Sequence, residues 1–193
     1  MSLTERKRIW RRTYRASRAA RRTTHSDTTV TLNDIKPIIG QVPRTTTIAG
    51  YSPLTSEVDV LPLLREWVEG GGVALVPTPD ALASAGRSAP LWQVFQASPE
   101  GRLGAEPELR ALGDATLILV PGLVFGSDGR RLGRGAGWYD RALSTASPDA
   151  LLVGVCHDEE LIERALVPIE DHDRLVDFVL TPSTLVSCRP TLN

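Results

Sequence analysis

The stretch from residue 131 to 140, Arg-Leu-Gly-Arg-Gly-Ala-Gly-Trp-Tyr-Asp, constrains the fold of this chain more than any other segment. It follows an apolar run over 116–121 that predicts a buried strand, and a loop-like segment over 122–129. Asp140 stands at the start of the helix expected next. A strand, a loop, a glycine-rich turn and a helix in this order are typical of α/β proteins, which bind ligands at the carboxyl edge of their sheet.

The composition of this run suits a polyphosphate. Its alternating glycines are Gly133, Gly135 and Gly137. Glycine can enter left-handed backbone conformations and approach a ligand closely, so that successive N–H groups converge on phosphate oxygens. Arg131 and Arg134 can add positive charge and forked hydrogen bonds, and Asp140 can hold the magnesium ion that accompanies a nucleotide. The alternative is an ordinary glycine-rich connection between a strand and a helix.

Two familiar glycine motifs do not fit this run. A Walker loop requires Lys followed by Ser or Thr directly after its last glycine, whereas Gly137 precedes Trp138. A dinucleotide fingerprint requires a wider gap between its second and third glycines than the spacing found here.

Further apolar runs predict a three-layer α/β fold with a mostly parallel sheet. Strands are expected over 47–53, 72–77 and 151–156, with the last strand over 178–181. Residues 57–67 have the spacing of an amphipathic helix, whose first turn would contain Glu57 and which the glycines at 70–72 would end. The length of 193 residues and the 41% hydrophobic content favour a single domain spanning 1–193.

The first 22 residues form a strongly basic segment, expected to be a helix packed on the α/β body. They carry nine Lys and Arg residues against one acid, a local charge of +8, although the whole chain has a net charge of −1. The remainder is therefore acidic, so the segment can pack on it without a nucleic-acid partner. Lys7 and Arg11 lie four residues apart and would share one helix face. A mitochondrial targeting segment and an unliganded, solvated basic face are the alternatives.

Hydropathy argues against a membrane-spanning protein, and the cysteine content argues against a protein stabilised by disulfides. No apolar run approaches about 18 residues, so no membrane span is expected. Cys156 and Cys188 are the two cysteines, and they read as free thiols in a reducing compartment. We therefore expect a cytoplasmic protein, without a hydrophobic signal segment, and a monomer.

The glycine run also resembles the signature of the 5-formyltetrahydrofolate cyclo-ligases, or methenyltetrahydrofolate synthetases. That signature is Pro-Gly, a short variable loop, and then Arg-Leu-Gly-Arg-Gly-x-Gly-Tyr-Tyr-Asp. Here Pro121-Gly122 is followed by the run at 131–140 with the same internal spacing. Ala136 stands where the family usually has glycine or lysine, and Trp138 replaces the first tyrosine.

Three further elements carry the same resemblance. Lys7 and Arg11 match a Lys-x-x-Leu-Arg element that contacts ATP in the family, with Trp10 in the leucine place. Tyr51 and Glu57, with the proline between them, match a Tyr-x-Pro strand end followed by a folate-binding glutamate. The segment 167–177 is close to Pro-x-x-x-x-His-Asp-x-x-x-Asp, whose aspartate at the position of Asp173 joins Asp140 at magnesium in relatives.

The resemblance implies an ATP- and Mg²⁺-dependent enzyme with a Rossmann-like sheet of the NagB/RpiA/CoA-transferase type. Its substrate would be the reduced folate 5-formyltetrahydrofolate, its products 5,10-methenyltetrahydrofolate, ADP and phosphate. The expected catalytic residues are Arg134 and Lys7. The expected nucleotide-binding residues are Lys7, Arg11, Arg131, Gly133, Arg134, Gly135, Ala136, Gly137, Trp138 and Tyr139. The expected folate-binding residues are Tyr51, Ser52, Glu57 and Trp138, and the expected metal ligands are Asp140 and Asp173.

Two other functional classes remain open from the sequence. One is a sugar-phosphate isomerase or CoA-transferase-like enzyme of similar fold, which would have no reason to keep Lys7, Glu57 and Asp173 together. The other is a non-catalytic folate- or RNA-binding relative, with Ala136 and Trp138 as signs of lost activity.

Overall fold

The computed structural model describes residues 1–21, 28–40, 42–43, 46–78, 91–96, 108–163, 166–170 and 173–189. Its helices are α1 (Leu3–Arg21), α2 (Lys36–Ile39), α3 (Leu61–Glu69) and α5 (Trp138–Leu143), with short 3-10 turns η1 (Leu32–Ile35), η2 (Leu112–Asp114) and η3 (Asp158–Glu160). Its strands are β1 (Thr47–Ala49), β2 (Val73–Pro77), β3 (Trp92–Val94), β4 (Leu109–Arg110), β5 (Ala115–Pro121), β6 (Val124–Gly126), β7 (Arg131–Leu132), β8 (Leu151–Val155), β9 (Leu161–Ile162), β10 (Phe178–Leu180) and β11 (Leu185–Ser187).

The main sheet has eight strands in the order β11-β10-β8-β5-β1-β2-β3-β4. The five central strands, from β10 to β2, are parallel, whereas β11, β3 and β4 pair antiparallel at the two edges. The mostly parallel α/β sheet expected from the sequence is therefore confirmed. A second sheet of three short strands has the order β7-β6-β9 and carries the segment that leads into the glycine run.

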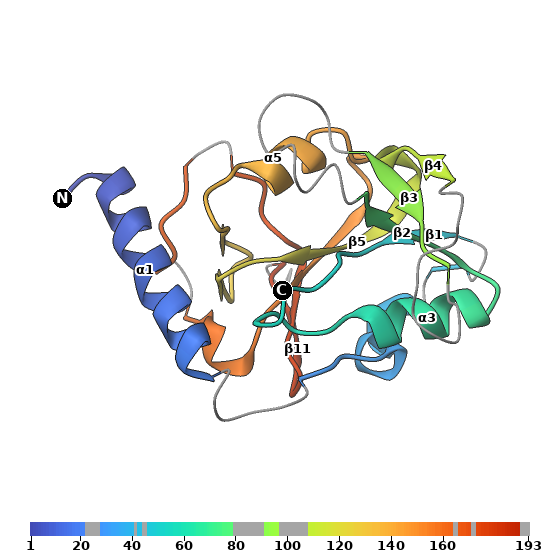
Figure 1. Cartoon of the computed structure of the whole chain (residues 1–193), viewed down its shortest axis with the longest axis horizontal. Coiled ribbons are helices and arrows are strands. Elements are labelled where there is room, and N and C mark those ends of the chain that lie inside the picture. Colours follow the sequence, from blue (N-terminus) through green and yellow to red (C-terminus); the bar gives the residue numbers. More distant parts are fainter. Residues whose placement is uncertain are drawn as a thin grey trace.

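Helices cover both faces of the main sheet, with α3 below and α5 above it in the view of Figure 1. Alternate residues of β5 supply the two cores, because successive side chains of a strand point to opposite faces. Leu117 and Leu119 pack in the cluster that contains Trp67 of α3. Ile118 and Val120 pack in the cluster that contains Trp138 of α5. The two layers of helix around one sheet are the three-layer arrangement that the alternating elements predict.

The basic helix α1 lies at one end of the molecule and packs on the small sheet rather than on the main one (Figure 1). Trp10 and Tyr14 contact an apolar cluster of Val124, Leu132 and Val167. Lys7 and Arg18 are the buried residues of this helix. Apolar side chains of α1 therefore hold this basic helix against the small sheet.

Several secondary-structure expectations were wrong. The segment 122–129, expected to be a loop, contains strand β6, and the strand expected over 47–53 ends at Ala49. The helix expected from residue 57 begins at Leu61, because residue 59 forms a parallel bridge with Thr29 and Pro62 occupies the first turn. Glu57 therefore lies in the loop before α3 and not in a helical turn. The strand at 178–180 is also not the last, because a turn closed by the Thr181 N–H bond to the Thr184 carbonyl leads into β11.

The described residues contain no helix that is both long and apolar enough to span a lipid bilayer. Cys156 and Cys188 are both buried free thiols, as expected from the sequence.

Candidate active site

A pocket of about 440 Å³ lies beside the carboxyl ends of β1 and β5. Five separate parts of the chain meet there: α1, the loop after β1, the turn after β5, the glycine run and the loop before β10. The candidate residues that line it are Lys7, Arg11, Tyr51, Ser52, Glu57, Arg131, Gly133, Arg134, Gly135, Ala136, Gly137, Trp138, Tyr139, Asp140 and Asp173. All candidate residues from the sequence thus surround one cavity, although their individual roles stay predictions.

The glycine run forms an irregular loop that α1 holds in place. Gly135 and Gly137 have positive φ angles of 98° and 64°, so the need for glycine at these positions is explained. Gly133 does not adopt a left-handed conformation, and this part of the expectation was wrong; a Cβ there would instead meet the Arg131 guanidinium at 2.8 Å. The Arg11 Nε atom donates to the Gly133 carbonyl over 3.1 Å. Arg11 therefore stabilises the loop from behind as well as lining the pocket.

The two ends of the glycine run are joined by an ion pair between Arg131 and Asp140. The Arg131 side chain is nearly buried, and its Nε atom has no hydrogen-bond partner among the described residues. Asp140 belongs to the first turn of α5 and has the more exposed side chain of the two. The pair leaves a cation and a carboxylate side by side at the pocket wall.

Lys7 lies opposite the glycine run, between two carboxylates. Its Nζ atom is 3.0 Å from Asp173 Oδ2 and 3.2 Å from Glu170 Oε2. Asp173 also accepts a hydrogen bond from the Glu170 backbone N–H over 2.8 Å, so the loop that carries both acids is tied to itself. Lys7 is thus neutralised by two carboxylates. A triphosphate would compete with them for Lys7, and a metal ion would compete with Lys7 for them.

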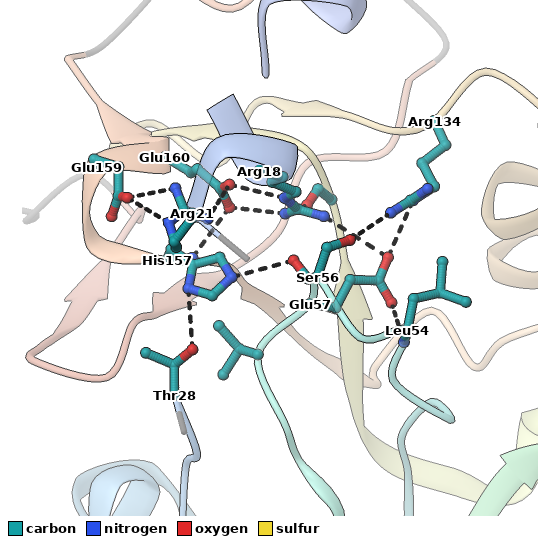
Figure 2. A network of polar contacts seen from close by, with 12 residues as sticks. Arg18, Arg21, Thr28, Leu54, Ser56, Glu57, Arg134, His157, Glu159 and Glu160 are labelled. Atoms are coloured by element: carbon teal, nitrogen blue, oxygen red, sulfur yellow. Dashed lines mark hydrogen bonds and ion pairs between the residues drawn. The ribbon is translucent and has the colours of Figure 1, made fainter. Parts of the chain in front are cut away.

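Glu57 is bonded on both of its carboxylate oxygens. Oε2 accepts from the Leu54 backbone N–H over 3.1 Å, which shapes the loop after β1. Oε1 accepts from Arg134 Nε over 3.2 Å and lies 3.8 Å from Arg18 Nη1 (Figure 2). The glycine run and the predicted folate residue therefore touch each other directly in this structure.

Two tyrosines of the pocket are neutral phenols. Burial raises the pKa of both Tyr51 and Tyr139 well above the ordinary value, and the nearby Glu57 adds to this. Tyr51 donates to the Val58 carbonyl over 2.8 Å, so its hydroxyl supports the loop rather than facing a ligand. The buried Tyr139 hydroxyl has no hydrogen-bond partner among the described residues.

Trp138 forms an aromatic wall of the pocket. Its ring centroid lies 5.7 Å from that of Trp92 and 4.7 Å from that of Tyr139, the latter in an edge-on arrangement. Only 9% of the residue is exposed, because it also packs in the core under α5. Tryptophan in place of the family's tyrosine therefore has a structural role here in addition to lining the cavity.

The residues present fit a magnesium ion only in combination with a nucleotide. The described residues contain no group of three or more His, Cys, Asp or Glu side chains placed to hold a metal ion. Asp140 and Asp173 line the same pocket and each now pairs with a cation. Mg²⁺ is commonly held by one or two carboxylates, with substrate phosphates and water as the other ligands. Such a shared site suits this donor set.

Replacement of Gly135 by alanine is expected to weaken nucleotide binding. A residue with a Cβ is strained at this positive φ by about 1–2 kcal/mol, and the Cβ would lie 3.1 Å from Arg11 Nε, against the side chain that holds the loop. The KM for ATP should rise about tenfold in steady-state assays. Gly71→Ala is the matched control, because Gly71 has a φ of 89° with no atom near its Cβ position and lies outside the pocket. Equal ATP KM values in both variants would contradict a role for the loop conformation.

Two charged residues of this region, Glu170 and Arg18, were not predicted from the sequence. Glu170 lines the pocket and pairs with Lys7. The sequence offered one indication of this role, namely that Glu170 lies three residues before Asp173. Arg18 is buried beneath Glu57 and could have been found by helical spacing, because Lys7, Arg11, Tyr14 and Arg18 follow at intervals of four, three and four residues and so share one face. His172, which appeared in the motif before β10, lies outside the described residues.

Comparison with protein families gives one match over almost the whole chain. Residues 4–182 match the model of the 5-formyltetrahydrofolate cyclo-ligase family. The chain is 37% identical over 147 residues to a 5-formyltetrahydrofolate cyclo-ligase of Mycolicibacterium smegmatis, covering 70% of this chain and 73% of that protein. It is 32% identical over 107 residues to the mitochondrial enzyme of that name from Arabidopsis thaliana, covering 50% of this chain and 39% of that protein.

Solved structures support the same fold. The solution structure of a 5,10-methenyltetrahydrofolate synthetase from Aquifex aeolicus matches with a TM-score of 0.68 and 23% identity, over 97% of this chain and 95% of that one. A 5,10-methenyltetrahydrofolate synthetase from Mycoplasma pneumoniae matches with a TM-score of 0.63 and 18% identity, over 91% of this chain and 98% of that one.

Proposed function

This chain belongs to the 5-formyltetrahydrofolate cyclo-ligase family, and we propose that the pocket around the glycine run is where it converts 5-formyltetrahydrofolate to 5,10-methenyltetrahydrofolate. The reaction of this family depends on ATP. The observation that carries the assignment to this pocket is the convergence of five distant chain segments, each with a family-like residue, on one cavity.

The chemical problem is the formyl group on nitrogen 5, which is an amide and a poor electrophile. Transfer of the γ-phosphoryl group of ATP to the formyl oxygen converts that oxygen into a leaving group. Nitrogen 10 then attacks the formyl carbon and loses its proton, and the carbon–oxygen bond breaks to release phosphate. The protein has to align the two substrates and neutralise phosphate charge, which are the main contributions to phosphoryl transfer. No protein nucleophile is needed.

The cationic side of the pocket is the proposed site of the triphosphate. Backbone N–H groups of the glycine run, together with Arg131 and Arg134, would bind its oxygens, and Arg11 would keep the loop in place. Lys7 faces the same cavity from α1 and would approach the phosphate as Asp173 turns to the metal ion. Arg134 and Lys7 are the groups proposed to stabilise charge on the transferred phosphoryl group.

The opposite side of the pocket is the proposed folate site. The Glu57 carboxylate suits the neighbouring N–H donors of the aminopyrimidinone ring, because a carboxylate accepts such paired bonds with good geometry. Ser52 and Tyr51 follow β1 and border this region, and the Trp138 and Tyr139 rings supply apolar walls for the pterin. Glu57 and Arg134 are in contact, so the formyl group of a folate held by Glu57 would lie near the phosphate-binding loop.

Mg²⁺ would be bound by Asp140 and Asp173 with phosphate oxygens, and would supply charge neutralisation for the triphosphate. Asp140→Asn is expected to reduce turnover at least about 100-fold by removing a hard anionic ligand and the partner of Arg131. Titration of the residual rate with Mg²⁺ should show a raised requirement for the metal ion. Asp149→Asn is a control in an exposed turn after α5. An unchanged Mg²⁺ dependence in Asp140→Asn would remove Asp140 from the metal site.

The direct test mixes purified protein with 5-formyltetrahydrofolate and follows the near-ultraviolet absorbance of the methenyl product. A rise in absorbance that needs both ATP and Mg²⁺ is expected. Calorimetric titration with folate and with ATP accompanies it. Binding of both without product would contradict the catalytic proposal, and absence of binding would contradict the placement of either substrate in this protein.

A further inference from the structure

A buried arginine, Arg18, lies directly behind the proposed folate carboxylate and outside the pocket around the glycine run. Its side chain is 3% exposed and that of its partner Glu160 is fully buried. Arg18 Nε and Nη2 bond the two Glu160 oxygens over 2.8 and 2.7 Å. Nη2 also donates to the carbonyl of Gly122, in the turn after β5. One side chain of α1 thus joins the turn after β5 to Glu160 in η3, and Figure 2 shows its forked contact with Glu160.

The remaining nitrogen of Arg18 points at Glu57. Nη1 is buried, has no hydrogen-bond partner among the described residues and lies 3.8 Å from Glu57 Oε1. A buried donor without a partner costs free energy unless another interaction offsets it. Here the offset is the charge of Glu57, whose side chain is only 9% exposed. Although burial lowers the pKa of Arg18, its bonds to Glu160 more than offset this and raise it, so the guanidinium stays charged.

Glu160 keeps this arrangement rigid. Besides Arg18, it accepts from Arg21 Nη1 over 3.2 Å and from the backbone N–H of His157 over 3.1 Å. The His157 ring in turn contacts the Ser56 carbonyl through Nε2 over 3.2 Å, and Ser56 directly precedes Glu57. Since a carbonyl only accepts, Nε2 carries the ring proton. The same glutamate therefore fixes both Arg18 and the backbone next to Glu57.

Glu57 has a second arginine partner of a different kind. Arg134 Nε lies 3.2 Å from the same Glu57 oxygen, but its side chain is 39% exposed and comes from the glycine run. When Arg134 turns to the phosphates of ATP, Glu57 loses that partner. Arg18 cannot leave, because Glu160 and Gly122 hold it. Glu57 Oε1 thus has one exchangeable and one permanent arginine partner, while Oε2 keeps its bond to the Leu54 backbone N–H.

We infer that Arg18, fixed by Glu160, is a positioning residue that keeps the Glu57 carboxylate oriented for the pterin ring throughout the reaction. This inference rests on the proposed folate site at Glu57. Arg18 would not touch the substrate. It would act on the folate through Glu57, so its removal should weaken folate binding and leave ATP binding unchanged.

The test is the charge-neutral double variant Arg18→Met/Glu160→Gln, in which neither charge is left buried alone and the new amide oxygen can still accept from the His157 N–H. The KM for 5-formyltetrahydrofolate is expected to rise about tenfold, with the KM for ATP within about twofold of wild type. Calorimetry with folate in the absence of nucleotide should show the same weakening. Equal folate affinity in the double variant and wild type would overturn the inference.

Arg21→Met is the matched control. Arg21 lies one turn further along α1 and contacts the same Glu160. It also pairs with Glu159, and among the described residues it forms no ion pair with Glu57. Its replacement should leave folate KM unchanged. An equal rise in both variants would mean that general loosening of α1 is responsible, and would overturn the role of Arg18.

A double-mutant cycle with Glu57→Gln gives a second readout that a purely structural role would not produce. If Arg18 acts through Glu57, the Arg18→Met/Glu160→Gln change should weaken folate binding no further in the Glu57→Gln background. Independent, additive losses would overturn the inference.

If the double variant does not fold, Arg18→Lys replaces it. An ammonium group cannot keep the forked bonds to Glu160 and also reach Gly122 and Glu57. The folate KM of Arg18→Lys should rise in the same selective way.

Failure of this inference can be told apart from failure of the proposed function. Wild-type protein that forms methenyl product while the variants keep normal folate KM contradicts only the role of Arg18. Wild-type protein that binds no folate in calorimetry contradicts the folate site itself and, with it, the inference.

Discussion

Arg134→Ala is expected to lower kcat about 1000-fold while leaving folate affinity at or slightly above the wild-type level. Loss of an arginine that neutralises a transferred phosphoryl group typically costs about 10³-fold or more in rate. The same arginine donates to Glu57 Oε1 over 3.2 Å, so its removal also frees that oxygen for the pterin. Single-turnover rates and calorimetric folate titration measure the two effects separately.

Arg141→Ala serves as the control for that experiment. Arg141 donates to the Ala136 carbonyl of the glycine run over 3.3 Å, yet it does not contact Glu57 in the described structure. It should change kcat only slightly. A loss of folate affinity with kcat unchanged in Arg134→Ala would show that the arginine binds the ground state and the transition state alike, contrary to the role proposed for it.

Arg18→Met alone is expected to destabilise the fold by about 3–5 kcal/mol, because it leaves the fully buried Glu160 charge without its forked partner. For a chain of this length, such a loss corresponds to a fall in Tm of about 10 °C. Thermal unfolding followed by circular dichroism measures it. The double variant Arg18→Met/Glu160→Gln should recover most of the loss, since no lone charge is buried. Equal Tm values for the single variant and wild type would mean that the pair contributes little to stability.

The residues of the pocket were predictable because their motifs have fixed spacing and belong to strand ends and helix starts. Asp140 is a good example: the buried strand before the run and the helix after it place it at the sheet edge by chain order alone. The beginning of α3 was less predictable. Glu57 lies within an amphipathic pattern, but the bridge between residue 59 and Thr29 is a contact between distant segments and leaves no local signal.

The burial of Arg18 and its pairing with Glu160 could not be predicted, because they depend on contacts between distant segments. Arg18 and Glu160 are 142 residues apart, and nothing in either local sequence predicts that they meet in the interior. Charged residues on an arginine-rich helix are ordinarily expected to face solvent. The helical spacing from Lys7 to Arg18 indicates a common face, but only the packing of Trp10 and Tyr14 on the small sheet shows that this face is the covered one.

The position of α1 in the finished fold has a consequence for biosynthesis. The hydrogen bonds described above join this helix to residues from Gly122 to Asp173, and the bond between Lys7 and Asp173 spans 166 positions. At translation rates of about 5–20 residues per second, the helix would wait roughly 10–30 s after emerging from the ribosome before its last partner is made. During that interval Glu160, Glu170 and Asp173, three carboxylates that pair with this cationic helix, have not yet been made, and ribosomal RNA is the nearest polyanion. Docking of α1 would then be the step that completes the pocket, and the onset of ATP binding would report that the chain has finished folding.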